Sequence, residues 1–152
     1  MSPTRSVRES AEYIGRTDSP MAIIVRAGFR ADGIEFLTPN HYSQQLGVMN
    51  RPQGYVIQPH IHNPVARAIQ FTKEVLFIKS GRVRVDFYDD HKHYLESRIL
   101  YPGDMILLAF GGHGFEMLEA SEIIEVKQGP YAGDADKTGF TPISNEQILI
   151  KA

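Results

Sequence analysis

Short strand-like runs separated by turn-forming residues are the feature that most constrains how this chain folds. Each run holds roughly four to eight residues rich in β-branched and aromatic side chains, and Gly, Pro, Asn or Asp residues stand between the runs. In Arg82–Tyr88, for example, Val83, Val85 and Phe87 alternate with charged side chains, as in a half-buried strand. Almost no stretch has the period of an amphipathic helix. We therefore expect an all-β fold, either a sandwich or a barrel.

The expected strands follow one another at regular spacing, and we expect them to form one domain. They are Met21–Val25, Gly33–Leu37, Tyr42–Met49, Tyr55–His62, Phe71–Ile78, Arg82–Tyr88, His93–Leu100, Met105–Phe110, His113–Leu118 and Glu122–Gln128. Met105–Phe110 is almost continuously apolar, which is typical of a strand covered on both faces. The single barrel domain would span residues 21–152 and end in a loop-rich tail, to which Ile148–Ile150 could add an edge strand. Residues 1–20 are expected to be a flexible segment, in which Glu9–Ile14 could make a turn of helix.

Composition narrows the classes of partner. The formal net charge is -2 and no block of basic residues is present, which argues against a nucleic-acid partner. The chain has no cysteine, so neither a disulfide framework nor a thiolate site is expected. No apolar run is long enough to cross a membrane, and the polar N-terminus does not resemble a secretory signal. We therefore expect a cytoplasmic protein that has no membrane partner.

Two histidines mark the most informative stretch of the chain. His60 and His62 lie at the end of the expected strand Tyr55–His62, which would pair with Tyr42–Met49 in a hairpin. Residues two apart on a strand point to the same face, so the two imidazoles would project together. Glu74 then opens the next long run of strand-forming residues. Two imidazoles and a carboxylate on neighbouring strands suit Fe, Mn, Ni, Zn or Cu, so the sequence predicts a partial metal site.

Two motifs around these residues resemble the paired motifs of the cupin superfamily. The first is carried by Gly54, His60, His62, Glu74 and Gly81, and the second by Gly103, Asp104, Gly111 and His113. Together they span residues 54–117, which is less than half of the chain. Eleven residues separate His62 from Glu74, more than is usual in that family, and this indicates a longer loop at the mouth of the barrel.

The resemblance implies both a fold and a metal centre. The fold would be a small double-stranded β-helix, or jelly-roll, barrel. Its interior would hold one divalent ion (Fe, Mn, Ni or Zn), with His60, His62, Glu74 and His113 as the ligands. His113 is the only histidine that follows the Gly103–Asp104 turn, so no other histidine competes for that place. His91 and His93 have the same spacing as the first pair but stand at an expected hairpin tip, where no carboxylate-bearing strand is expected in register.

Other residues are candidates for binding or catalysis. Gln58, Tyr88 and Phe115 could line a pocket for a small-molecule ligand, and Arg67 could hold an anionic substrate at the mouth of the barrel. Glu74 and Glu125 are the candidate acids or bases, although we expect Glu125 to point outward.

Two classes of function remain open from the sequence. Four protein ligands leave metal positions open for oxidation or isomerisation of a small molecule, and the cupin resemblance suggests a sugar or a sugar nucleotide. The alternative is a non-catalytic module that senses a small molecule or a metal. We also expect a homodimer, with residues before about Asn40 supplying much of the contact.

Overall fold

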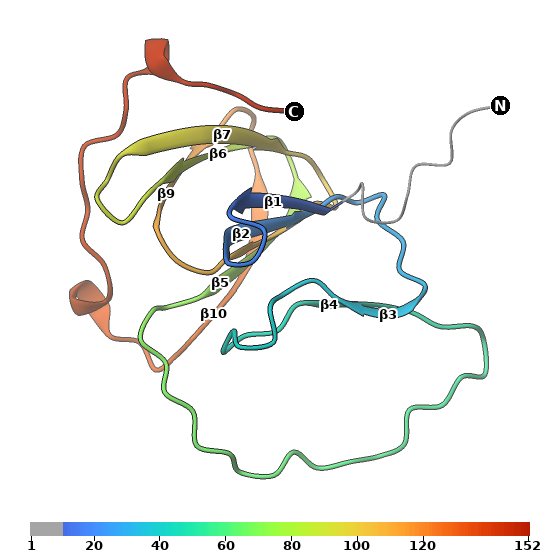
Figure 1. Ribbon diagram of the computed structural model, residues 1–152. Coiled ribbons are helices and arrows are strands. Elements are labelled where there is room, and N and C mark those ends of the chain that lie inside the picture. Colours follow the sequence, from blue (N-terminus) through green and yellow to red (C-terminus); the bar gives the residue numbers. More distant parts are fainter. Residues whose placement is uncertain (1–10) are drawn as a thin grey trace, which may run out of the picture.

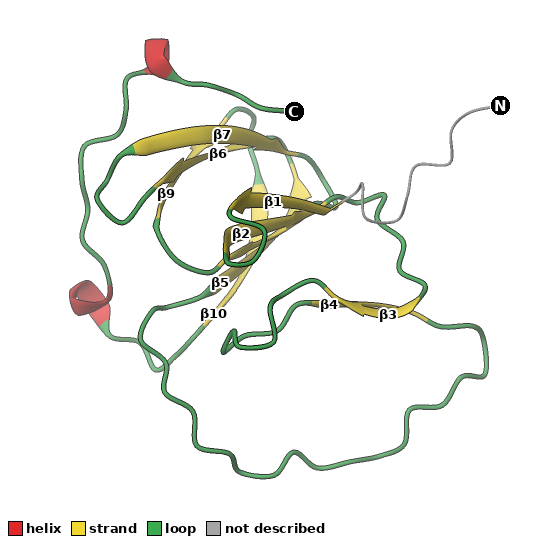
Figure 2. Ribbon diagram, viewed as in Figure 1, coloured by secondary structure: helices red, strands yellow, loops and turns green. Residues whose placement is uncertain are grey.

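The computed structural model describes residues 11–152 and confirms an all-β chain. These residues form ten strands and two short 3₁₀ helices, Gly133–Asp136 and Asn145–Gln147. Figures 1 and 2 show the strands in three layers, with a three-stranded sheet on one side, a five-stranded sheet in the middle and a two-stranded hairpin on the other side. Residues 11–152 do not close into a barrel. None of the helices described is long and apolar enough to span a membrane.

The middle layer is an antiparallel sheet in the order β1-β2-β8-β5-β10. Its strands are β1 (Ala11–Gly15), β2 (Pro20–Val25), β5 (Glu74–Ser80), β8 (Met105–Leu108) and β10 (Glu122–Lys127). The central strands β2 and β8 are buried almost throughout. This confirms the prediction, made from its continuous apolar run, that the strand at Met105 is covered on both faces.

The second layer is an antiparallel sheet in the order β7-β6-β9, formed by β7 (Tyr94–Leu100), β6 (Val83–Tyr88) and β9 (Gly112–Met117). Alternation in β6 turns Val83, Val85 and Phe87 toward the five-stranded sheet, and all three are buried. They pack against alternate residues of β2, β5 and β8, which form the main core. The face of each sheet that is turned toward the other is called the inner face below.

The third layer is the hairpin of β3 (Gly33–Phe36) and β4 (Gly47–Asn50). Val48 of β4 and the flanking Leu37 and Leu46 pack against a second apolar cluster that contains Val25, and Met105 packs against the same cluster. Val25 and Met105 are paired residues on the outer face of the five-stranded sheet, so the hairpin covers part of that face. Beyond the hairpin, residues 51–73 run as a long loop without regular secondary structure, well away from both sheets (Figure 1).

Several of the expected strands need correction. Tyr55–His62 is not a strand, and the hairpin expected between it and Tyr42–Met49 does not form, because β4 pairs with β3 instead. Ala11–Gly15, expected within a flexible segment, is an ordered strand whose Ile14 enters the core; residues 1–10 lie outside the described residues. Near the C-terminus, Ile150 makes a parallel bridge to Ser97, so the tail lies along the edge of β7.

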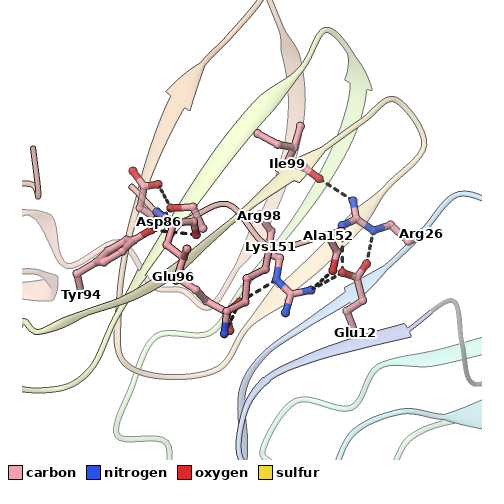
Figure 3. A network of polar contacts seen from close by, with 11 residues as sticks. Glu12, Arg26, Asp86, Tyr94, Glu96, Arg98, Ile99, Lys151 and Ala152 are labelled. Carbon is pink, nitrogen blue, oxygen red and sulfur yellow. Dashed lines mark hydrogen bonds and ion pairs between the residues drawn. The ribbon is translucent and has the colours of Figure 1, made fainter. Parts of the chain in front are cut away.

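A polar network joins the edge strand β1 to the second sheet and to the C-terminus (Figure 3). The guanidinium of Arg26 donates to Glu12, to the carbonyl oxygen of Ile99 at 2.7 Å and to Asp104 at 2.8 Å. Arg98 donates to the same Glu12 carboxylate and to the carbonyl oxygen of Ala152. Glu12 is thus held between two arginines from different layers, which fixes β1 in place.

The turn between β5 and β6 has no room for a side chain at Gly81. Gly81 has a φ of 85°, and an added Cβ would lie 2.2 Å from Ser121 Oγ and 2.4 Å from the Ala120 carbonyl oxygen. We expect Gly81→Ala to lower the free energy of unfolding by about 2–4 kcal/mol, because backbone strain and overpacking add. The matched control is Gly15→Ala. Gly15 has the same φ of 85° and no contact closer than 3.6 Å, so strain alone should cost it about 1 kcal/mol. Equal urea midpoints for the two variants would contradict this account.

Candidate functional site

Glu74 and His113 meet across the interior of the molecule. Glu74 begins β5 of the five-stranded sheet, and His113 lies on β9 of the three-stranded sheet. His113 Nε2 is 3.2 Å from Glu74 Oε2, and both side chains are more than two-thirds buried. In register, His113 lies opposite the core residue Phe87, so its ring points to the inner face. The structure thus brings together two of the four residues that the sequence predicted as metal ligands, from strands that belong to different sheets.

The surroundings of Glu74 favour its charged form. The hydrogen bond with His113 is the main cause that holds the pKa of Glu74 below its ordinary value, and it outweighs the opposing effect of burial. The charges of His113 and Lys127 and a contact with Glu125 lower this pKa further. Glu74 is therefore a carboxylate near neutral pH, the form in which it accepts a hydrogen bond or binds a cation.

Glu125 also belongs to this region, although the sequence analysis placed it outward. In register, Glu125 lies opposite Leu76, and Lys127 lies opposite Glu74. Leu76 is a core residue, so Glu125 and Lys127 share the inner face of the five-stranded sheet with Glu74. Lys127 Nζ is 4.0 Å from Glu125 Oε1. Alternation along β10 left two orientations open, and only the register with β5 decides between them.

The inner face of β9 is only partly covered. Phe115 and Met117 lie opposite the core residues Val85 and Val83, so they point toward the interior beside His113. Yet Phe115 is 37 % and Met117 is 47 % exposed. The ring of Phe115 contacts that of His113, with 5.5 Å between their centroids. Phe115, predicted to line a pocket, thus lies beside His113 on the inner face, and no strand of the described residues covers the free edge of β9.

His60 and His62 lie on the long loop and do not join Glu74 and His113 in this chain. Every residue from 51 to 71 is exposed. The two imidazole rings are nevertheless neighbours, with centroids 5.1 Å apart. His60 Nδ1 donates to the carbonyl oxygen of Gln58 at 2.8 Å, which leaves its Nε2 as an acceptor or ligand. The prediction that the pair projects from a barrel strand is wrong for the single chain, because the segment has no neighbouring strand.

The other candidates fall into two groups. Gln58 and Arg67 lie on the same exposed loop as the histidine pair. Tyr88 lies opposite Gly112 and therefore points away from the face that carries His113. Its ring packs against Tyr94 and Phe140, and its hydroxyl oxygen accepts a hydrogen bond from the backbone N–H of Ile143 at 3.0 Å. Tyr88, predicted to line a pocket, therefore contacts the C-terminal tail and does not share the face of His113.

No cluster of three or more His, Asp or Glu side chains that could hold a metal ion occurs within residues 11–152. A cavity of about 310 Å³ lies elsewhere, lined by Met21, Leu95 and Phe110 together with residues of the β1–β2 and β6–β7 turns. It shares no residue with the Glu74–His113 pair. Comparisons with family models, with curated proteins and with solved structures found no match to this chain.

Proposed function

We propose that this protein is a metal-binding cupin of the jelly-roll type that acts on a small molecule. Its centre would hold one divalent ion, Fe, Mn, Ni or Zn, with His60, His62, Glu74 and His113 as ligands. The observation that carries the proposal is the contact between His113 Nε2 and Glu74 Oε2 at 3.2 Å across the interior. The two residues lie 39 positions apart in the chain and on different sheets, and one belongs to each of the two sequence motifs.

Two of the four proposed donors lie side by side in this conformation. Glu74 is a carboxylate on the inner face, and the imidazole of His113 is beside it. The other two imidazoles are adjacent to each other and lie outside the layered core. Imidazole and carboxylate donors suit the first-row divalent ions named above, and such sites retain open positions for substrate or water.

The chemistry follows from the groups that surround the pair. A bound divalent ion would polarise an oxygen atom of a substrate, as oxidation or isomerisation requires. Glu125 is placed on the inner face to hold or accept a proton, and Lys127 beside it supplies a positive charge. Phe115 offers an apolar surface next to His113, and Arg67 on the long loop would contact an anionic group. A sugar or sugar nucleotide matches this combination of charged and aromatic contacts.

Metal content tests the proposal directly. The protein is purified without a metal-affinity tag, supplied with Fe, Mn, Ni or Zn, dialysed and examined by elemental analysis. We expect close to one ion per chain for at least one of these metals. Protein that is folded by circular dichroism and retains none of the four ions would overturn the proposed metal centre. Loaded protein is then screened for turnover of sugar nucleotides.

A further inference from the structure

Residues 51–73 form a loop whose large apolar side chains are exposed in this chain. The large apolar side chains exposed along it are Tyr55, Val56, Ile57, Ile61, Val65, Ile69 and Phe71. Ile61 is 90 % exposed. Within the described residues, the only backbone–backbone hydrogen bond recorded for positions 51–71 is the turn from Tyr55 N–H to the Pro52 carbonyl oxygen. A long loop of this composition leaves apolar surface in water, and holding it in one conformation costs chain entropy that burial against another surface would offset.

A complementary surface exists at strand β9. β9 is an edge of its sheet, because β6 pairs with it on one side and no strand in the described part of the chain pairs with it on the other. Its inner-face residues Phe115 and Met117 are partly exposed, as described above. An extended segment added to this edge would continue the sheet, pair the free backbone groups and cover these two side chains.

The spacing of the two histidines suits a strand added at the edge of β9. His60 and His62 would lie on the same face of an added strand, since they are two residues apart. Placed on the inner face of the extended sheet, both rings would lie on the side that carries His113 and Glu74. This one pairing would give the edge of β9 a partner strand and cover exposed apolar residues. It would also bring the two histidines to the other two proposed metal ligands.

The path of the chain argues that the added strand comes from a second copy. The segment begins at β4, which is anchored through Val48 on the outer face of the five-stranded sheet. β9 belongs to the sheet on the opposite side of that layer. From β4 the segment runs away from both sheets before it returns to β5 (Figure 1). A two-fold exchange lets each copy fill the edge of the other without displacing the anchored hairpin.

Charge does not oppose the same approach. Residues 51–73 contain Arg51, Arg67 and Lys73 and no acidic residue, whereas residues 112–127 contain four glutamates and a single lysine. Three of those glutamates already pair with Arg84, Arg82 and Lys79 of neighbouring strands. Glu125 remains on the inner face, where its pairing with Lys127 is long at 4.0 Å. Charge therefore does not oppose the approach of the segment to β9 and β10, and apolar contact would hold it there.

We propose that the protein is a segment-exchanged homodimer in which residues 51–73 of one copy add to β9 of the other. Each metal centre is then shared, with His60 and His62 from one chain and Glu74 and His113 from its partner. The shared ligand set rests on the proposed function, whereas the exchange itself does not. The proposed interface lies along the 51–73 segment and β9, whereas the sequence analysis expected it at residues before about Asn40. Of the early strands, β2 is already paired on both sides within the chain's own sheet.

The exchange is tested first without metal, by cross-linking. The chain has no cysteine, so Gln58→Cys and Met117→Cys provide the only reactive thiols for a short bismaleimide. A heterodimer prepared from one copy with Gln58→Cys and one with Met117→Cys should give a covalent dimer on a denaturing gel. Gln58→Cys combined with His91→Cys at the β6–β7 turn is the control and should give none. A chain that carries both Gln58→Cys and Met117→Cys tests the alternative, in which the segment pairs with β9 of its own chain. An intrachain product in this double variant, with no product in the mixed heterodimer, would overturn the exchange. A concentration-independent monomer in sedimentation would also overturn it.

The second arm tests the shared centre. One copy carries His60→Ala and His62→Ala, and the other carries Glu74→Gln and His113→Gln. Neither homodimer should retain metal, whereas the co-expressed heterodimer should retain one ion per two chains, half of the wild-type content. A cross-linked heterodimer without metal would keep the exchange and reject the shared centre. Wild-type metal binding with an intrachain cross-link would keep the metal centre and reject the exchange.

Discussion

Replacing Arg26 by alanine should lower the free energy of unfolding by about 3 kcal/mol. The Arg26 side chain is 24 % exposed and bridges Glu12 of β1 and Asp104 of the turn before β8. Asp104 is 5 % exposed, and without Arg26 it keeps only its hydrogen bonds from backbone N–H groups, including those of Ala27 and Tyr101. Two carboxylates would then be left in a partly buried place with less compensating charge. The same change also removes the hydrogen bond from Arg26 to the Ile99 carbonyl oxygen (Figure 3).

The matched control is Arg16→Ala. Arg16 also makes a bidentate contact with a carboxylate, that of Asp18, but both side chains are largely exposed. Ion pairs at such sites contribute little to stability. Urea unfolding followed by circular dichroism should therefore show a clear drop in midpoint for Arg26→Ala and no measurable change for Arg16→Ala. Similar midpoints in the two variants would mean that the network does not stabilise the fold.

The same network predicts a dependence of stability on pH. Burial acts to raise the pKa of Glu12, but the hydrogen bonds and charges of Arg26 and Arg98 outweigh it and hold this pKa below its ordinary value. A carboxyl group with a lowered pKa stabilises the fold above its unfolded pKa of about 4.3, and this contribution is lost as the pH falls through the folded pKa. Glu12→Gln should therefore unfold at a lower urea concentration at pH 7. Its urea midpoint should also fall less steeply than that of the wild type when the buffer is acidified.

Replacing His60 and His62 together by alanine should abolish metal retention. The double change removes two of the four proposed ligands, and the loss of even one supporting group around a metal typically weakens binding by about 10–100-fold. We therefore expect affinity to fall by more than about 100-fold, to near zero ions per chain after dialysis. Both residues are exposed on the loop, so the all-β circular dichroism spectrum should not change.

His91→Ala with His93→Ala is the control for this experiment. These two histidines have the same spacing, with ring centroids 6.2 Å apart, and they lie at the tip of the β6–β7 turn, where His93 contacts Asp89. This variant should retain as much metal as the wild type. Retention by the His60/His62 variant, or loss in the His91/His93 variant, would show that the ligand set is wrong.

The sequence pattern predicted strands well where a partner strand lies in the same chain. The alternation of Val83, Val85 and Phe87 identified both β6 and its buried face, and the apolar run at Met105 identified a strand covered on both sides. Tyr55–His62 has the same strand-forming character, yet it is a loop here. A strand is stable only beside a partner strand, and local pattern does not show whether that partner lies in the same chain or in another.

The sequence predicted which residues of the candidate site lie together better than it predicted how they are oriented. Glu74 and His113 were placed together by motif order, and they do meet in the interior. The face of β10 that carries Glu125 was not predictable from the sequence, because alternation defines two faces without deciding which is inner. That choice depends on the register between β10 and β5, a contact between segments that are more than 40 residues apart. The unpaired edge of β9 likewise follows from the order of strands in the sheet, and nothing in the sequence of residues 112–117 predicts it.

Diffraction data collected across the absorption edge of the loaded metal test the central claim most directly. The metal-loaded dimer should show one anomalous peak for each Glu74–His113 pair, with ring nitrogens at about 2.0–2.2 Å. The peak should be ligated by Glu74 and His113 of one chain and by His60 and His62 of its partner. A peak held by other residues, such as His91 and His93, would contradict the account. Fully ordered Glu74 and His113 side chains with no peak between them, in protein supplied with excess metal, would contradict it as well.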